Sequence, residues 1–158
     1  MAEITIFTDG AAKGNPGPGG YGVVLLSGKY QKELSQGYRK TTNNRMELLA
    51  VIVGLEALKK EKSEVLIFSD SKYVVDSVEK GWVFNWQKKG FAKKKNVDLW
   101  KRFLVIYSKH KVRFEWVKGH AGNQWNERCD QLAVKAATST NLLVDEGFEN
   151  QSKDESLF

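Results

Sequence analysis

The sequence has a single cysteine and no long apolar segment. One cysteine, Cys129, excludes an intrachain disulfide and any zinc site built from several cysteines. The longest unbroken apolar run, residues 48–53, is much shorter than the ~18 residues that a membrane span needs, and the start MAEIT lacks the basic region of a signal peptide. We therefore expect a soluble, cytoplasmic chain that does not contact a membrane. Its 158 residues suit one domain with an ordinary core.

Positive charge is concentrated in one part of the chain. Lysine and arginine number 25 against 19 acids, which is a formal net charge of +6. Residues 80–96 hold six lysines and no acid, with aromatic residues between them, whereas residues 139–158 hold five acids and one lysine. A solvated surface is the simplest explanation of a basic block, but lysines interleaved with aromatics suit a surface that neutralises phosphates and stacks on sugars or bases. We therefore favour a polyanionic partner and expect the acidic tail to be mobile.

Apolar residues recur first with alternating and later with helical spacing, which predicts an α/β sheet with antiparallel and parallel pairs. The predicted order is three strands, a long and largely buried helix, a strand, two helices, a strand and a helix. The strands are predicted at residues 4–8, 21–26, 30–39, 64–69 and 112–117, and the helices at residues 44–60, 71–80, 97–108 and 124–137.

Four acidic residues stand at positions that suit a metal site. Asp9 ends the first strand and Asp70 ends the fourth. If these two strands are adjacent and parallel, both side chains meet at the carboxyl edge of the sheet, where α/β proteins bind ligands. Glu47 lies in the first turn of the long helix, and Asp130 lies in the middle of the last helix.

Each of these acids also has a simpler structural explanation. Asn44 and Glu47 fit an N-x-x-E capping box at the start of the long helix. Taken one residue at a time, the spacing leaves such alternatives open. The others are a turn at Asp9-Gly10, a helix cap at Asp70-Ser71, and a solvated Asp130 beside Arg128 or Lys135.

Five motifs carry a resemblance to a known family. In chain order they are FTDGAAKGNPGPGGYG, TTNNRMELLA, SDSKYV, NVDLW and WVKGHAGNQWNERCDQLA. With these motifs the sequence resembles the type 1 ribonuclease H family, to about residue 137. The resemblance implies a ribonuclease H-like fold, a mixed five-stranded sheet of three antiparallel and then two parallel strands flanked by helices. It also implies a catalytic domain at residues 1–138 that includes a basic handle at residues 80–96, followed by the tail at residues 139–158.

The activity that the resemblance implies is hydrolysis of the RNA strand of RNA/DNA hybrids, with 5′-phosphate and 3′-hydroxyl products. The family's metal ligands map onto Asp9, Glu47, Asp70 and Asp130, and its loop histidine maps onto His120. Clustered carboxylates repel one another unless cations offset their charge, and oxygen-only ligands suit Mg²⁺, or Mn²⁺, with two ions when substrate is bound. His120 lies between two glycines, where an imidazole can carry protons or assist product release. The alternative is a surface histidine in a loop.

The resemblance also assigns residues to the two substrate strands. Lys40 stands where many relatives have arginine, and Lys72 stands where glutamine is common, so the phosphate and minor-groove contacts differ from the family pattern. The residues expected to bind substrate are Gly10, Asn15 and Asn43 on the RNA strand, Lys40, Thr42 and Asn96 on a DNA phosphate, Lys72 in the minor groove, and Trp82, Trp86, Lys88, Lys89, Lys93, Lys94 and Lys95 in the handle.

Two other functions remain to be weighed. A catalytically silent hybrid-binding module gains nothing from clustered negative charge near phosphates. Another nuclease of the same fold, such as a resolvase or integrase core, would leave the basic handle and the TTNNRMEL motif unexplained. We therefore expect a monomeric endonuclease that acts on RNA/DNA hybrids. Because this chemistry needs no protein nucleophile, we expect Cys129 to be a core residue.

Overall fold

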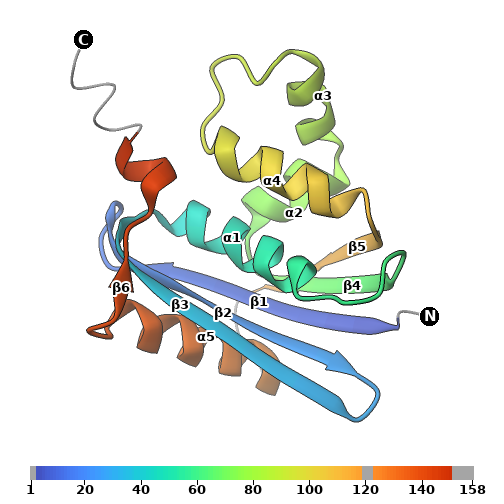
Figure 1. Ribbon diagram of the computed structural model, residues 1–158, viewed down its shortest axis with the longest axis horizontal. Coiled ribbons are helices and arrows are strands. Elements are labelled where there is room, and N and C mark those ends of the chain that lie inside the picture. The colour runs from blue at the N-terminus through green and yellow to red at the C-terminus, as the bar shows by residue number, and fades with distance from the viewer. Residues whose placement is uncertain (1–2, 119–122, 151–158) are drawn as a thin grey trace.

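A computed structural model describes residues 3–118 and 123–150 (Figure 1). Within these ranges the strands form one sheet in the order β5-β4-β1-β2-β3-β6, with α1 on one face and α5 on the other. None of the helices in these ranges is both long and apolar enough to cross a membrane. The strands are β1 (Ile4–Ala12), β2 (Gly17–Ser27), β3 (Tyr30–Thr41), β4 (Glu64–Ser69), β5 (Lys111–Trp116) and β6 (Leu142–Leu143), and the helices are α1 (Asn43–Glu56), α2 (Lys72–Glu79), α3 (Trp82–Lys88), α4 (Val97–Tyr107) and α5 (Gln124–Ala137).

The strand β1 lies near the centre of the sheet. It pairs antiparallel with β2, which pairs antiparallel with β3. On its other side β1 pairs parallel with β4, which pairs parallel with β5. The predicted mixed sheet, with its adjacent and parallel first and fourth strands, is therefore confirmed. Since Phe7 lies beside Phe68 in the β1–β4 pair, both strands carry their carboxyl ends to the same edge.

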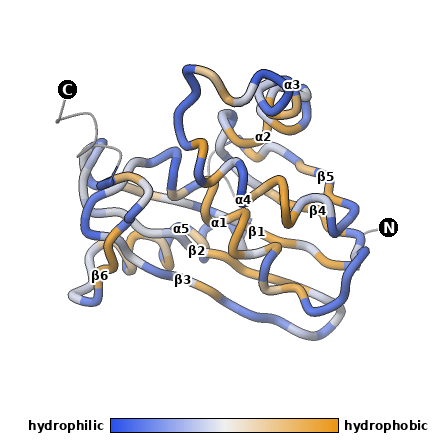
Figure 2. The backbone as a smooth tube through the Cα atoms, turned by 45° about the horizontal axis from the view of Figure 1, so that its top comes forward, coloured by the Kyte–Doolittle hydropathy of each residue, from blue (hydrophilic) through white to orange (hydrophobic). Residues whose placement is uncertain are grey.

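The main core lies between the sheet and α1. This helix is covered by β1 and β2 on one side and by α4 on the other, and Figure 2 shows the hydrophobic parts of these elements together in the middle of the molecule. Leu48, Ile52 and Leu55 therefore have no exposed surface. Burial of each such side chain contributes roughly 1.5–3 kcal/mol to folding. Because α1 is buried in this way, the side chain of Glu47 is also almost fully buried.

The helix α5 packs against the opposite face of the sheet, over β1, β2 and β3. The approach is close because Gly22 of β2 has no side chain. A Cβ atom at this position would lie 2.3 Å from the carbonyl oxygen of Cys129. Cys129 is buried, and its thiol donates a hydrogen bond to the Phe7 carbonyl oxygen at 3.2 Å. Burial raises the pKa of this thiol to about 12, so Cys129 packs in the core as predicted.

The structure contains two elements that the sequence patterns do not predict. The basic segment includes a further helix, α3, which follows Gly81 in the left-handed conformation at φ 76°. The sheet has a sixth strand, β6, which pairs in parallel with residues 37 and 38 at the edge of β3. We expected residues 139–158 to be mobile, whereas residues 142–150 contact the domain through β6 and through the buried side chain of Asp145. Residues 151–158 lie outside the described ranges.

Candidate active site

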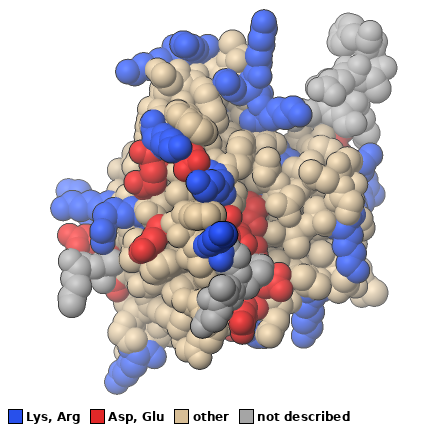
Figure 3. All heavy atoms as spheres, turned by 180° about the vertical axis from the view of Figure 1, so that it is seen from behind, with Lys and Arg blue, Asp and Glu red and all other residues tan. Residues whose placement is uncertain are grey.

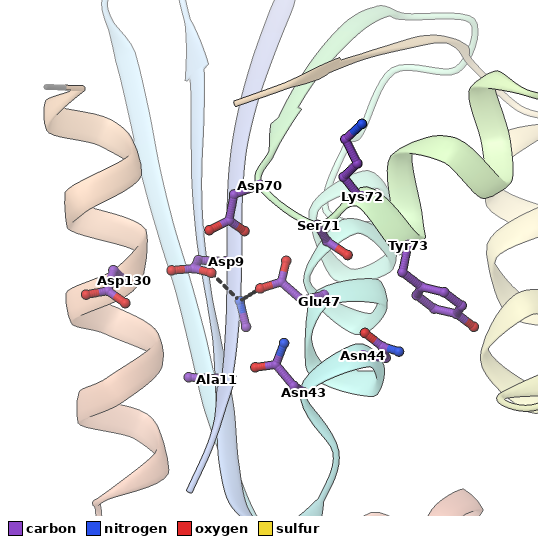
Figure 4. A pocket seen from close by; sticks show the side chains of 11 residues that line it. Asp9, Ala11, Asn43, Asn44, Glu47, Asp70, Ser71, Lys72, Tyr73 and Asp130 are labelled. Carbon is purple, nitrogen blue, oxygen red and sulfur yellow. Dashed lines mark hydrogen bonds between the residues drawn. The ribbon is translucent and has the colours of Figure 1, made fainter. Parts of the chain in front are cut away.

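Three of the predicted metal ligands meet at the carboxyl edge of the sheet. Asp9 comes from β1, Glu47 comes from α1, and Asp70 follows β4 directly. Each side chain offers one carboxylate oxygen, and these three atoms lie within 4.8 Å of one another. Figure 4 shows the three carboxylates pointing toward a common space. The fold thus brings together acids that are up to 61 positions apart in the chain.

The backbone of Gly10 holds two of these carboxylates in place. Its N–H donates to Asp9 Oδ1 at 2.9 Å and to Glu47 Oε1 at 2.8 Å (Figure 4). A side chain at position 10 would prevent this approach, because a Cβ atom would lie 2.4 Å from both the Glu47 backbone nitrogen and the Met46 carbonyl carbon. Glycine at this position therefore lets β1 and α1 come close enough for one N–H to orient both acids.

The electrostatics of this cluster favour a bound cation. Asp9 and Glu47 are only 4% and 3% exposed. The pKa of Glu47 is raised well above its ordinary value, first by burial and then by the neighbouring acids Asp9 and Asp70. Glu47 Oε2 is buried and has no hydrogen-bond partner among the described residues, although most buried polar atoms have one. An all-oxygen donor set with one buried oxygen left over fits a hard divalent cation.

Asp130 approaches the same space from α5. Figure 4 shows it on the helix that faces β1 from the side opposite to α1. Together with the other three acids it lines an open pocket of about 480 Å³. The fifth predicted catalytic residue, His120, lies outside the described residues, so its role stays a prediction. The other residues that line the pocket are Gly10, Ala11, Asn43, Asn44, Ser71, Lys72 and Tyr73.

The helix caps decide one of the alternative explanations for these acids. The cap of α1 is Thr42, whose hydroxyl accepts a hydrogen bond from the Arg45 N–H at 3.2 Å. Glu47 accepts instead from Gly10 of β1, so a capping box is not the role of this acid. The cap of α2 is Ser71, while the carboxylate of the preceding Asp70 belongs to the acidic cluster.

Several residues expected to bind substrate lie near the start of α1. The side-chain oxygen of Asn15 accepts a hydrogen bond from the Asn43 N–H at 3.0 Å. Asn96 precedes α4 in the left-handed conformation, and its amide donates to the Tyr73 hydroxyl at 3.1 Å. Lys40 is exposed near the end of β3. Since Asn96 also lies 3.5 Å from Arg45 in the first turn of α1, residues from three separate segments of the sequence meet at this end of the helix.

Lys72 is held at the rim of the pocket by a tryptophan that the sequence patterns do not single out. Its ammonium nitrogen lies 4.6 Å from the ring centroid of Trp116. The indole N–H of Trp116 donates in turn to the Asp70 carbonyl oxygen at 3.1 Å. Trp116 is at the end of a short strand, where alternation alone cannot distinguish a functional aromatic from a structural one.

A second residue that the sequence interpretation missed is Arg45. It is 1% exposed and forms ion pairs with Asp98 and Asp145. A signal for it is present in the sequence, because Arg45 lies four positions before Leu49 on the apolar stripe of α1. A buried arginine on such a stripe requires an acidic partner.

The basic segment forms a projection made of α3 and the loop that follows it, called the handle below. Figure 3 shows lysine and arginine side chains extending from the top of the molecule, where Figure 1 places α3. Trp82 is 45% exposed, with Lys80 at 5.4 Å from its ring centroid. Trp86 packs against Trp100 of α4, with ring centroids 5.9 Å apart. Trp82 is therefore open to a ligand, while Trp86 supports the handle. The exposed lysines of the handle are Lys88, Lys89, Lys93, Lys94 and Lys95.

An acidic pocket at the carboxyl edge of a mixed sheet, in a chain that also has a projecting basic segment, is typical of nucleases. The RNase H family model matches residues 1–138. The chain is 58% identical over 150 residues to a Ribonuclease H of Desulforamulus reducens, with 92% of this chain and 94% of the relative covered. It is 52% identical over 152 residues to a Ribonuclease HI of Synechocystis sp., with 92% and 94% covered. The chain therefore belongs to the ribonuclease H family and is an enzyme of that family.

Solved structures agree with this assignment. The crystal structure of LC9-RNase H1, a type 1 RNase H with the type 2 active-site motif, is similar with a TM-score of 0.78 at 31% identity. That similarity covers 96% of this chain and 81% of the other chain. LC11-RNase H1, crystallised in complex with an RNA/DNA hybrid, has a TM-score of 0.65 at 28% identity over 85% of this chain and 96% of the other.

Proposed function

We propose that the protein is an endonuclease that cleaves the RNA strand of RNA/DNA hybrids and leaves 5′-phosphate and 3′-hydroxyl ends. The observation that carries this proposal is the cluster of Asp9, Glu47 and Asp70 in a chain of the ribonuclease H family. The hybrid bound to LC11-RNase H1 supports the same class of substrate here. Only a hybrid combines 2′-hydroxyl groups on one strand with deoxyribose on the other, so selectivity depends on contacts to both strands.

The metal ligands in this proposal are Asp9, Glu47, Asp70 and Asp130, which would hold Mg²⁺ or Mn²⁺, with two ions when substrate is bound. Such ions activate a water molecule and stabilise the leaving 3′ oxygen. The chain's own contribution is to fix the ligand oxygens, as the Gly10 N–H does for two of them. Burial, and then the negative charges of Asp9 and Asp70, raise the pKa of Glu47. A bound cation would offset this repulsion, which supports the assignment of Glu47 as a ligand.

The remaining roles follow the resemblance and stay proposals. His120 carries protons near neutral pH, where imidazole titrates. A monomeric state and a cytoplasmic location also stay predictions, which sedimentation and cell fractionation would test. Substrate binding is assigned to Gly10, Asn15 and Asn43 on the RNA strand, to Lys40, Thr42 and Asn96 on a DNA phosphate, to Lys72 in the minor groove, and to Trp82 and the five exposed lysines of the handle. Trp86, which was also expected to bind substrate, is instead assigned to support of the handle, because its ring packs on Trp100.

The decisive experiment compares an RNA/DNA hybrid, an RNA duplex and a DNA duplex of one sequence, each with Mg²⁺ and with EDTA. We expect cleavage of the RNA strand of the hybrid alone, and only with Mg²⁺. The new 5′ ends should accept a label from a polynucleotide kinase only after phosphatase treatment. The Asp70→Asn variant, purified in parallel, controls for contaminating nuclease. Binding of the hybrid without cleavage would favour the silent binding module, and cleavage of duplex DNA would favour another nuclease of this fold.

A further inference from the structure

A buried arginine connects the C-terminal segment to two other parts of the molecule. The Arg45 guanidinium binds the Asp98 carboxylate of α4 with two hydrogen bonds of 2.8 and 2.7 Å. It binds the Asp145 carboxylate of the C-terminal segment with two more, of 2.8 and 2.9 Å. Paired hydrogen bonds between a guanidinium and a carboxylate fix orientation as well as distance. Arg45 therefore holds the start of α1, the start of α4 and residue 145 in one arrangement.

Two of the residues proposed to bind a DNA phosphate belong to this arrangement. The hydroxyl of Thr42 accepts a hydrogen bond from the backbone N–H of Arg45 at 3.2 Å. The side-chain oxygen of Asn96 lies 3.5 Å from the Arg45 guanidinium. A change in the position of Arg45 would thus move both polar side chains, although they come from segments that are 54 positions apart.

The third residue of that group is coupled to Asp145 through the end of β3. The hydroxyl of Thr41 donates a hydrogen bond to Asp145 Oδ2 at 2.7 Å, and both side chains are buried. Lys40 and Thr42 are the chain neighbours of Thr41 on either side. The position of Lys40 relative to the helix therefore depends on the same carboxylate that binds Arg45.

The C-terminal segment, residues 142–150, is itself held against the domain by several contacts, so it can support Asp145. Its strand β6 pairs with β3, and Glu149 binds the exposed side chain of Arg39 with hydrogen bonds of 3.0 and 2.9 Å. The chain also passes close to this ion pair, since a Cβ atom at Gly147 would lie 2.7 Å from Arg45 Nη2 and 2.0 Å from Asp98 Oδ2. These contacts hold the C-terminal segment, and with it Asp145, in place. Figure 1 shows this segment on the side of the molecule where the loop before α4 ends.

We propose that Asp145 is a positioning residue for the DNA-phosphate site, and that it sets the relative positions of Lys40, Thr42 and Asn96 through Thr41 and Arg45. The inference rests on the proposed function, because it concerns how that substrate is held. It makes an acidic residue of the C-terminal segment favourable to nucleic-acid binding. If charge alone determined its effect, every acid of this segment would instead repel the phosphate backbone.

The test compares Asp145→Asn with Glu146→Gln in the full chain, because Glu146 is an exposed acid of the same segment. Both variants remove one negative charge from the same segment, so an effect of charge alone is nearly equal in the two. We expect Asp145→Asn to raise KM for the hybrid about two- to tenfold, the range that one hydrogen bond contributes, and to leave kcat unchanged. If the variant no longer binds that phosphate, the slope of log KM against log salt should also fall by ~0.9. Glu146→Gln should leave KM unchanged or lower it.

A second variant keeps the test decisive if Asp145→Asn fails to fold. Thr41→Val keeps the shape of the side chain and all charges but removes the hydrogen bond to Asp145, and we expect a smaller rise of KM in the same direction. If KM in both variants equals that of Glu146→Gln while their melting temperatures fall, Asp145 acts only on stability and the inference is overturned. Failure of the wild-type chain to cleave the hybrid would instead overturn the proposed function itself.

Discussion

Replacing Gly10 by alanine tests whether the approach of β1 to α1 determines the acidic site. The added Cβ atom would lie 2.4 Å from the Glu47 backbone nitrogen and from the Met46 carbonyl carbon, whereas ordinary contacts begin at 3.4 Å. The strand and the helix therefore have to separate by about 1 Å. Both contacts are to backbone atoms, so rotation of a side chain cannot relieve them. Overpacking of this kind costs about 1–3 kcal/mol of folding free energy.

The same displacement acts on the chemistry. The hydrogen bond from the Gly10 N–H to Glu47 Oε1 is 2.8 Å long, and a separation of about 1 Å takes it beyond the ~3.2 Å limit of such bonds. Glu47 then loses the donor that orients it. Misplacement of a catalytic group by about 1 Å can cost ~10²-fold in rate, so we expect kcat to fall by this order. The Mg²⁺ concentration that gives half-maximal activity should rise.

The assay measures hybrid cleavage against Mg²⁺ concentration, together with thermal unfolding. The control is Gly28→Ala in the β2–β3 turn, where φ is +58° and no described atom lies within 4 Å of the added Cβ. Alanine in this left-handed conformation costs roughly 1–2 kcal/mol through backbone strain alone. The two variants are thus matched in stability but not in their effect on the site. Equal activity of both at saturating Mg²⁺ would refute the reasoning.

Four further outcomes can be measured. Asp70→Asn should abolish Mg²⁺-dependent cleavage while the melting temperature stays near that of the wild type, and near-normal activity would contradict its role as a ligand. Replacing the five exposed lysines of the handle with glutamine should raise KM and flatten its salt dependence, by ~0.9 in slope for each phosphate that is no longer bound; an unchanged slope would show that the handle does not bind the substrate backbone. Trp82→Ala should weaken hybrid binding because its ring is exposed, whereas Trp86→Ala should lower the melting temperature because its ring packs on Trp100, and the opposite pattern would exchange these roles. Burial alone would raise the pKa of Asp98, but hydrogen bonds and charge from Arg45 outweigh it and lower this pKa below its ordinary value of 3.8. Asp98 therefore stabilises the fold above that value and loses this effect as pH falls through the lower folded-state pKa. The difference in melting temperature between wild type and Asp98→Asn should shrink in acid, and a constant difference would contradict the ion pair's contribution.

The sequence predicts elements well where local patterns and neighbouring elements agree. The ranges of β4 and α5 match the predicted residues 64–69 and 124–137 at both ends. The meeting of Asp9 with Asp70 follows from strand polarity, since two parallel neighbours end at the same edge. The pocket that adds Glu47 and Asp130 follows the motif order of the family rather than any local pattern.

The elements that were missed depend on contacts between distant residues. A strand of two residues, such as β6, contains no alternation to recognise and exists because the edge of β3 is available to it. The buried state of Asp145 requires Arg45, which lies 100 positions earlier in the chain. The capping box stayed an open alternative because Thr42 and Asn44 are both good cap residues. Only the contact of Glu47 with Gly10, from another element, decides between them.

The packing of α5 has a consequence for which substitutions the protein tolerates. In the β1–β2 pair Asp9 lies opposite Gly22, and Gly22 in turn faces the carbonyl oxygen of Cys129, the residue before Asp130. The distance between Asp130 and the other three acids therefore depends on Gly22, which has no side chain. Any larger residue there would push the helix outward and carry Asp130 with it. We therefore expect substitution of Gly22 to lower activity as strongly as substitution of an acid, although glycine has no group that can bind a metal or transfer a proton.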